Sequence, residues 1–286
     1  MMTDDVQGRK YTGFGRCIYC GSGGGETGLR DEHIIPFSLG GNAVIERASC
    51  AECEKKTSRI EGYLSRMIFL QFRTHTGVQT RRPKERPKSF DAVIRIGESV
   101  IEERPIPVAD HPMFLMVPIL PIAGLLRNEQ PTTQFEGATV TLYYGGHDDM
   151  HQRLGVDQSR RLQIKIDTTM DLALFGRALA KISFCTAVAT FGLVGFNHLD
   201  MPQLILGNYP FVPHYLGGDG TQGTSPPEPD SLHRSDIDMA EVGGSRMLVV
   251  KLRLFANHNA NGHGLPTYKV IVGALHPTAS SQILRT

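Results

Sequence analysis

The chain has 286 residues, 40% of them hydrophobic, and a formal net charge of +1. This length and apolar content are enough to bury a core in one large domain or two ordinary ones, so we expect a soluble globular protein. No run of 18 or more apolar residues occurs, and the first 30 residues are polar, charged and glycine-rich. The sequence therefore predicts no membrane span, no signal peptide and a cytoplasmic location.

The charge is distributed unevenly along the chain. Residues 1–90 carry a net charge of +5, whereas residues 91–286 carry −4. A basic N-terminal third is typical of a segment that contacts a polyanion, so we expect this end of the chain to bind one. Within this third, residues 1–16 are polar with scattered glycines and are predicted to form a loose lead-in.

Four of the five cysteines form two CxxC pairs, Cys17-Ile-Tyr-Cys20 and Cys50-Ala-Glu-Cys53, separated by 29 residues. An odd cysteine count disfavours a disulfide framework, and the repeated spacing indicates metal binding. Two such pairs complete a closed tetrahedral shell, with each Zn–S contact at about 2.3 Å, which predicts a structural zinc site. The alternative is four unrelated free cysteines. Cys185 stands apart and is predicted to be a small buried apolar residue.

A helix is predicted between Cys53 and His75. Its apolar residues recur at helical spacing, which is typical of an amphipathic helix, and Gly77 is a plausible stop. They are Ile60, Leu64, Met67, Ile68 and Phe72. The dense Pro and basic residues of 80–89 then predict a linker or basic strap that divides the chain into residues 1–79 and 90–286.

Beyond the strap, short runs rich in β-branched residues predict strands, and an Ala- and Leu-rich segment over 171–191 predicts a buried helix. The predicted strands are 90–96, 138–144, 246–255 and 268–272. Residues 90–286 are therefore expected to form an α+β domain that recognises a substrate or partner. The Gly-, Ser- and Pro-rich residues 217–229 predict a loop, and the histidine pairs at 147/151 and 258/263 are expected to lie in turns.

The segment Asp31-Glu-His-Ile-Ile-Pro-Phe-Ser-Leu-Gly-Gly-Asn42 lies between the two cysteine pairs, and Glu54 follows the last cysteine. Gly40 and Gly41 are expected to let the chain turn sharply after this run. Together with the cysteine pairs, it resembles the zinc-containing branch of the HNH, or ββα-metal, endonuclease family. The resemblance covers residues 17–62. It implies a small, treble-clef-like module in which a β-hairpin and a helix are clamped by zinc and hold one divalent ion.

The resemblance assigns roles to particular residues. His33 matches the general base, and Glu32 and Glu54 match ligands of a catalytic Mg²⁺ or Mn²⁺ ion, where the family more often has Asp and then Asn or His. Asn42 is assigned to the middle position of the motif. Carboxylates at both ligand positions still suit hard cations that prefer oxygen.

These residue types fit phosphodiester hydrolysis, which needs an activated water and stabilisation of charge on the phosphate and leaving oxygen. A histidine accepts a proton near neutral pH because its unperturbed pKa is about 6.5. The resemblance implies a nucleic-acid substrate and products with 5′-phosphate and 3′-hydroxyl ends. We expect DNA as the substrate, with RNA as the alternative.

Basic residues on the predicted helix are candidates for phosphate contacts. Arg59, Arg66 and Arg73 recur every seven residues, which places them near one face, and Lys55 precedes them. A solvated basic face is the alternative. Glu61, two turns after Glu54, is expected to form a salt bridge or to support a metal ligand rather than to bind the ion directly.

Three hypotheses follow. The first is a metal-dependent endonuclease acting on DNA, of phage, defence or mobile-element origin. The second is a zinc-dependent nucleic-acid-binding protein that does not cleave. The third makes residues 1–79 a structural appendage of an unrelated C-terminal enzyme.

Overall fold

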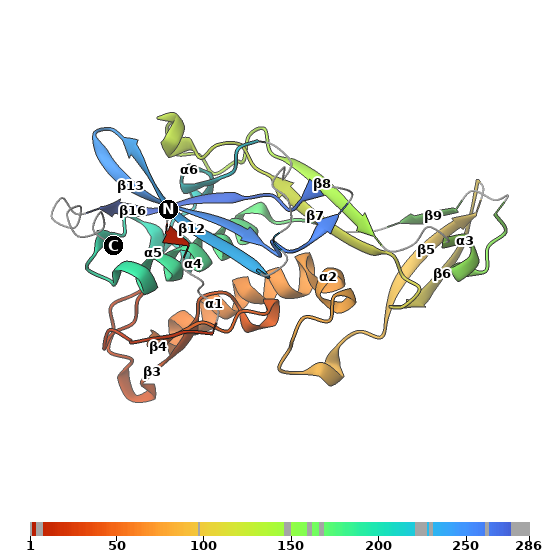
Figure 1. Cartoon of the computed structure of the whole chain (residues 1–286), viewed down its shortest axis with the longest axis horizontal. Coiled ribbons are helices and arrows are strands. Elements are labelled where there is room, and N and C mark those ends of the chain that lie inside the picture. Colours follow the sequence, from red (N-terminus) through yellow and green to blue (C-terminus); the bar gives the residue numbers. More distant parts are fainter. Residues whose placement is uncertain are drawn as a thin grey trace.

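The computed structural model describes residues 2–3, 8–96, 98–145, 150–158, 162–165, 169–220, 228, 231–260 and 263–275. The fold is mixed α+β, as predicted, with a small N-terminal unit packed beneath a larger sheet-containing region (Figure 1). The N-terminal elements are β1 (Met2–Thr3), β2 (Lys10–Tyr11), β3 (Leu29–His33), β4 (Val44–Cys50), α1 (Ala51–Tyr63) and α2 (Leu70–His75).

The N-terminal unit has the predicted hairpin followed by a helix. Strands β3 and β4 pair antiparallel, with Leu29 opposite Cys50 and His33 opposite Val44, and β4 runs directly into α1. The sheet order is β2-β4-β3, so part of the lead-in is a strand and not loose, and β1 pairs with β12. The prediction of an unstructured lead-in was wrong for these residues.

Two glycines allow the chain to turn between β3 and β4. Gly40 has φ +92°, a left-handed conformation that favours glycine. A Cβ on Gly41 would lie 2.1 Å from the carbonyl oxygen of Ile35, so only glycine permits this close approach. Both observations confirm the predicted sharp turn, which fixes the position of His33 relative to the following strand.

The predicted helix after Cys53 exists but contains an irregularity. A π-helical turn, Leu64–Ile68, separates α1 from α2, and Gly77 with φ +70° follows the end of α2. Because the π-helical turn is wider than an α-helical one, the residues after it face different directions from those that regular helical spacing predicts. Met67, predicted to be buried, is 59% exposed, whereas Phe69 is 1% exposed.

Within the described residues, the C-terminal region contains two sheets and two two-stranded ribbons, β7-β8 and β14-β15. The predicted strands are confirmed as β5, β8, β13 and β16, and the remaining strands were not foreseen. The elements are β5 (Ser89–Ile96), β6 (Ser99–Pro107), β7 (Met113–Ile119), β8 (Thr139–Gly145), α3 (Met150–Leu154), β9 (Leu162–Lys165), α4 (Leu172–Phe191), β10 (Phe196–Asn197), α5 (Met201–Leu206), α6 (Val212–Tyr215), β11 (Leu216–Gly217), β12 (His233–Val242), β13 (Ser245–Leu254), β14 (Asn259–Ala260), β15 (His263–Gly264) and β16 (Tyr268–Leu275). The larger sheet has the order β1-β12-β13-β16-β10, with β11 also on β16, and β6-β5-β9 forms the arm at the right of Figure 1.

Helix α4 is the central helix of the fold. Asp171 caps its N-terminus by accepting a hydrogen bond from the Leu174 backbone N–H at 2.9 Å. The helix is long and apolar enough to cross a membrane by composition, but 72% of that window is buried inside the protein, as expected of a core helix. It packs against α1 on one side and against β13 and β16 on the other.

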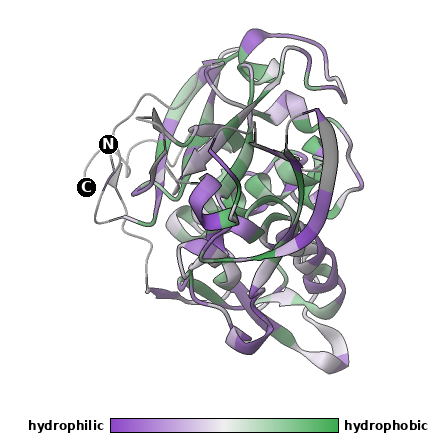
Figure 2. Ribbon diagram, turned by 90° about the vertical axis from the view of Figure 1, so that its right-hand side faces the viewer, coloured by the Kyte–Doolittle hydropathy of each residue, from purple (hydrophilic) through white to green (hydrophobic). Residues whose placement is uncertain are grey.

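One continuous hydrophobic cluster joins the N-terminal unit to the C-terminal region. Tyr19 packs on Phe184 with ring centroids 6.0 Å apart, and Phe72 packs on Phe255 at 4.5 Å. Figure 2 shows hydrophobic stretches gathered in the middle of the molecule and hydrophilic ones at outer turns. The two parts of the chain therefore bury surface against each other.

Some predicted turns fall outside the described residues. These are His147 and residues 221–227 and 229 of the predicted loop. His151 lies in helix α3, so the turn predicted at this residue was wrong, and His263 lies in the short strand β15.

Candidate active site

The four paired cysteines converge at the start of α1. Their sulfur atoms all lie within 4.8 Å of one another, and the Cys20 and Cys50 sulfurs are 3.6 Å apart. Tetrahedral zinc with Zn–S bonds of about 2.3 Å separates its sulfurs by about 3.8 Å. The cluster is thus positioned to bind a metal, and its geometry fits structural zinc with no ligand position left open.

The electrostatics of this cluster also favour a cation. Burial raises the pKa of the Cys17 thiol, and burial with the neighbouring sulfurs raises that of Cys53 well above its ordinary value. Burial opposes the ionisation of Cys20 too, but hydrogen bonds with Ser22 and the other sulfurs outweigh it and lower the pKa of Cys20 to about 6. Several thiolates can coexist in this buried site only if a cation such as zinc neutralises their negative charges.

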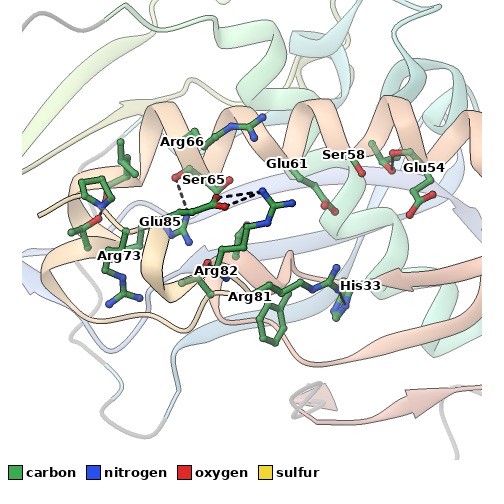
Figure 3. A pocket seen from close by; sticks show the side chains of 18 of the residues that line it. His33, Glu54, Ser58, Glu61, Ser65, Arg66, Arg73, Arg81, Arg82 and Glu85 are labelled. Carbon is green, nitrogen blue, oxygen red and sulfur yellow. Dashed lines mark hydrogen bonds and ion pairs between the residues drawn. The ribbon is translucent and has the colours of Figure 1, made fainter.

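An open groove of about 600 Å³ lies between β3, the helical segment α1–α2 and the strap formed by residues 80–89. His33, Glu54, Glu61, Arg66, Arg73 and Arg81 are among the side chains that line it. Figure 3 shows Glu54, Glu61 and His33 at one end, Arg66 and Arg73 at the other, and Arg81 and Arg82 between them. The strap thus forms one wall of the groove.

His33 is the last residue of β3 and lies half-buried in the groove. Its Nε2 is 3.0 Å from Nη2 of Arg81, and its ring lies 5.9 Å from that of Phe37. A guanidinium has no acceptor atom, so Arg81 donates to Nε2 and the ring proton is on Nδ1. The pKa of His33 is lowered, mainly because burial disfavours the charged imidazolium. The positive charges of Arg81 and then Lys181 lower it further.

Lys181, from the middle of α4, lies beneath the groove and is fully buried. Its Nζ is 2.7 Å from Glu32 Oε1 and 2.6 Å from Glu61 Oε1, and it donates hydrogen bonds to the carbonyl oxygens of His33 and Ile34. Burial alone would lower the pKa of Lys181, but the two carboxylates outweigh it and raise the pKa above its ordinary value. Lys181 therefore carries its charge and ties α1, β3 and α4 together.

The sequence analysis missed Lys181. It had one available signal, because a lysine inside an otherwise apolar helix rarely occurs buried without a charged partner. That signal predicts that a partner exists, but it does not say that the partner is Glu32, 149 residues earlier in the chain.

The other predicted site residues are placed differently. Glu54 lines the groove and forms an ion pair with Arg30. Asn42 is exposed, accepts a hydrogen bond from the Gly8 N–H at 2.5 Å and does not line the groove. Lys55 and Arg59 are exposed outside the groove, whereas Arg66 and Arg73 line it.

A catalytic divalent ion would find oxygen donors in this groove. Asp31, Glu54 and Glu61 line it together with Glu32, and Mg²⁺ is commonly held by one or two carboxylates, several waters and the substrate phosphate. Among the described residues, the cysteine cluster alone gathers three or more close metal-ligating side chains. The donor set fits an ion held jointly with the substrate, with Oε1 of Glu32 already bonded to Lys181.

Comparison with known proteins agrees with this geometry. Residues 17–69 match the family model described as HNH endonuclease. No curated protein and no solved structure matches the chain. The match includes both cysteine pairs, the β3–β4 hairpin, His33 and the whole of α1. The N-terminal part of this chain is therefore an HNH domain that carries a four-cysteine metal-binding cluster.

Proposed function

We propose that the protein is a metal-dependent endonuclease that hydrolyses phosphodiester bonds in DNA. The observation that carries this proposal is the position of His33 in the groove of the HNH domain, between carboxylates on one side and arginines on the other. Structural zinc in the cysteine cluster holds the hairpin and α1 together. Residues 90–286 contribute Lys181 to the floor of the site.

His33 removes a proton from the attacking water through Nε2 once this atom is free of Arg81. Lys181 donates a hydrogen bond to the His33 carbonyl oxygen and so holds the backbone from which the imidazole projects. A Mg²⁺ or Mn²⁺ ion bound by Glu54 and Glu32, when present, supplies charge stabilisation to the phosphate and to the leaving oxygen. Glu61 keeps Lys181 charged and in place.

The pH profile of cleavage should report the environment of His33. Because its pKa is lowered, the neutral base persists to lower pH, and we expect the acid limb of the kcat/KM profile below the ordinary histidine value of about 6.5. Arg81→Ala removes a repelling positive charge, so the pKa of His33 should rise and the acid limb should move to higher pH. Lys84→Ala, on the same strap but outside the groove, is the control and should leave the limb unchanged. An acid limb unaffected by Arg81→Ala would contradict the assignment of this limb to His33.

The activity itself is tested with supercoiled plasmid. We expect the purified, zinc-loaded protein to nick or linearise it with added Mg²⁺ or Mn²⁺ and not without a divalent ion. A folded RNA transcript in a parallel reaction separates DNA from RNA substrates. The absence of cleavage of either polymer under all these conditions would refute the proposal.

A second candidate is a zinc-dependent protein that binds nucleic acid without cleaving it. It is favoured by the placement of Asn42 outside the groove and by the ion pair between Glu54 and Arg30, which occupies an expected metal ligand. This candidate predicts DNA binding with no divalent-ion-dependent product.

A further inference from the structure

We propose that four arginines of the groove, which we call the arginine wall, hold the phosphate backbone of duplex DNA as it approaches His33. The wall consists of Arg66, Arg73, Arg81 and Arg86. This inference rests on the proposed function for its substrate class. It assigns a role to the strap, which the sequence predicted as a linker or basic strap without a defined contact. Lys55 and Arg59 do not line the groove and are not part of the wall.

The first argument is that the wall lacks counter-charges. Among the described residues, no carboxylate forms an ion pair with any of its four arginines, whereas the neighbouring Arg82 pairs with Glu85 at 3.3 Å. Arg73 donates to the Ser65 carbonyl oxygen at 3.2 Å, and Arg86 donates to that of Val78. These backbone contacts orient the guanidinium groups without neutralising them.

The second argument is that two of these groups repel each other. Burial, followed by the charge of Arg86, lowers the pKa of Arg73. Bringing like charges together in a partly buried groove costs free energy unless an anion lies between them. Phosphate suits this role because guanidinium groups bind it through two parallel, charge-assisted hydrogen bonds.

The third argument is the position of Arg81. It lies between the two ends of the groove, with its guanidinium 5.4 Å from the centre of the Phe37 ring and bonded to His33 Nε2. A phosphate oxygen is a stronger acceptor for arginine than a neutral imidazole. An arriving phosphate therefore draws Arg81 away from His33, which frees the Nε2 lone pair for water. Substrate binding and release of the base are coupled through this one side chain.

The test measures binding, not cleavage. Fluorescently labelled duplex DNA is titrated with zinc-loaded His33→Ala protein at several salt concentrations. Neutralising one phosphate contributes about 0.9 to the slope of log K against log salt. We expect Arg73→Gln/Arg86→Gln in this background to make the slope shallower by about 1.8, because two phosphate contacts are lost.

Two matched variants make the result specific. Lys84→Gln/Lys88→Gln removes the same charge from the strap at positions that do not line the groove, and should change the slope by less than half as much. Arg73→Lys/Arg86→Lys keeps the charge and should preserve the slope. Zinc content and melting temperature, measured for each protein, identify a variant that has lost its fold.

The outcomes separate this inference from the proposed function. Equal slopes for the two glutamine variants, an unchanged slope for Arg73→Gln/Arg86→Gln, or no DNA binding by the parent protein would overturn the arginine wall. A shallower slope in a protein whose wild type never cleaves DNA would support the wall and refute the nuclease. Cleavage by the wild type, with an unchanged slope for Arg73→Gln/Arg86→Gln, would support the nuclease and refute the arginine wall.

Discussion

Cys17→Ser is expected to abolish tight zinc binding and to unfold the HNH domain. Cys17 is 1% exposed and its sulfur belongs to the four-atom cluster, so serine leaves three thiolates around a metal that needs four ligands. Zinc binding supplies about 10–16 kcal/mol in small zinc-dependent domains, and most of this supports folding. The measurements are zinc content per chain and the thermal unfolding curve.

The fifth cysteine provides the control. Cys185 is also fully buried, but it lies in α4 and its sulfur contacts the Tyr19 hydroxyl at 3.3 Å, outside the cluster. Cys185→Ser should therefore retain one zinc per chain. If Cys17→Ser kept its zinc and its melting temperature, the cluster would not be the structural metal site.

Lys181→Met is expected to lower the free energy of unfolding by about 3–5 kcal/mol, because removing one partner of a buried ion pair leaves the other charge uncompensated. The charge left uncompensated is the carboxylate of Glu32, which is 4% exposed and forms an ion pair with Lys181 at 2.7 Å. Loss of Lys181 also removes the hydrogen bonds to the carbonyl oxygens of His33 and Ile34. Denaturant unfolding of the full chain measures this cost.

Two further variants show that the cost belongs to the buried pair. Lys181→Met/Glu32→Gln removes the lysine charge together with the more buried of its two carboxylate partners, so it should be less destabilised than the sum of the two single variants. Lys251→Met breaks a partly exposed ion pair with Asp238 at 2.6 Å and should cost less than about 1 kcal/mol. Similar costs for Lys181→Met and Lys251→Met would show that the buried cluster is not important for stability.

The local features of the candidate site were predictable from the sequence. The cysteine spacing predicted the metal cluster, and the glycine pair predicted the turn after β3, because both depend on residues close together in the chain. The apolar spacing from Ile60 to Phe72 predicted the helix. It failed at Met67, since spacing alone does not reveal the π-helical turn that rotates this residue outward.

The features that depend on distant contacts were not predictable. Lys181 meets the carbonyl oxygen of His33 across 148 residues, and Arg81 meets the imidazole across 48. Strand β12 was missed because its sequence contains charged residues. One of them, Asp236, is nevertheless buried, with Oδ2 2.6 Å from Arg234 Nε. The contacts of Lys181 and Arg81 with His33 exist only once the chain is folded, so no local pattern records them.

The most direct test of the central claim compares the wild type with His33→Ala on supercoiled plasmid with Mg²⁺ or Mn²⁺. Both proteins are first shown to contain equal zinc and to melt at similar temperatures. Loss of a general base should reduce the cleavage rate by about 10²–10⁴-fold. Nicking by the wild type with such a loss in His33→Ala is the result that we predict. Equal cleavage by both proteins would contradict the role of His33 as the base.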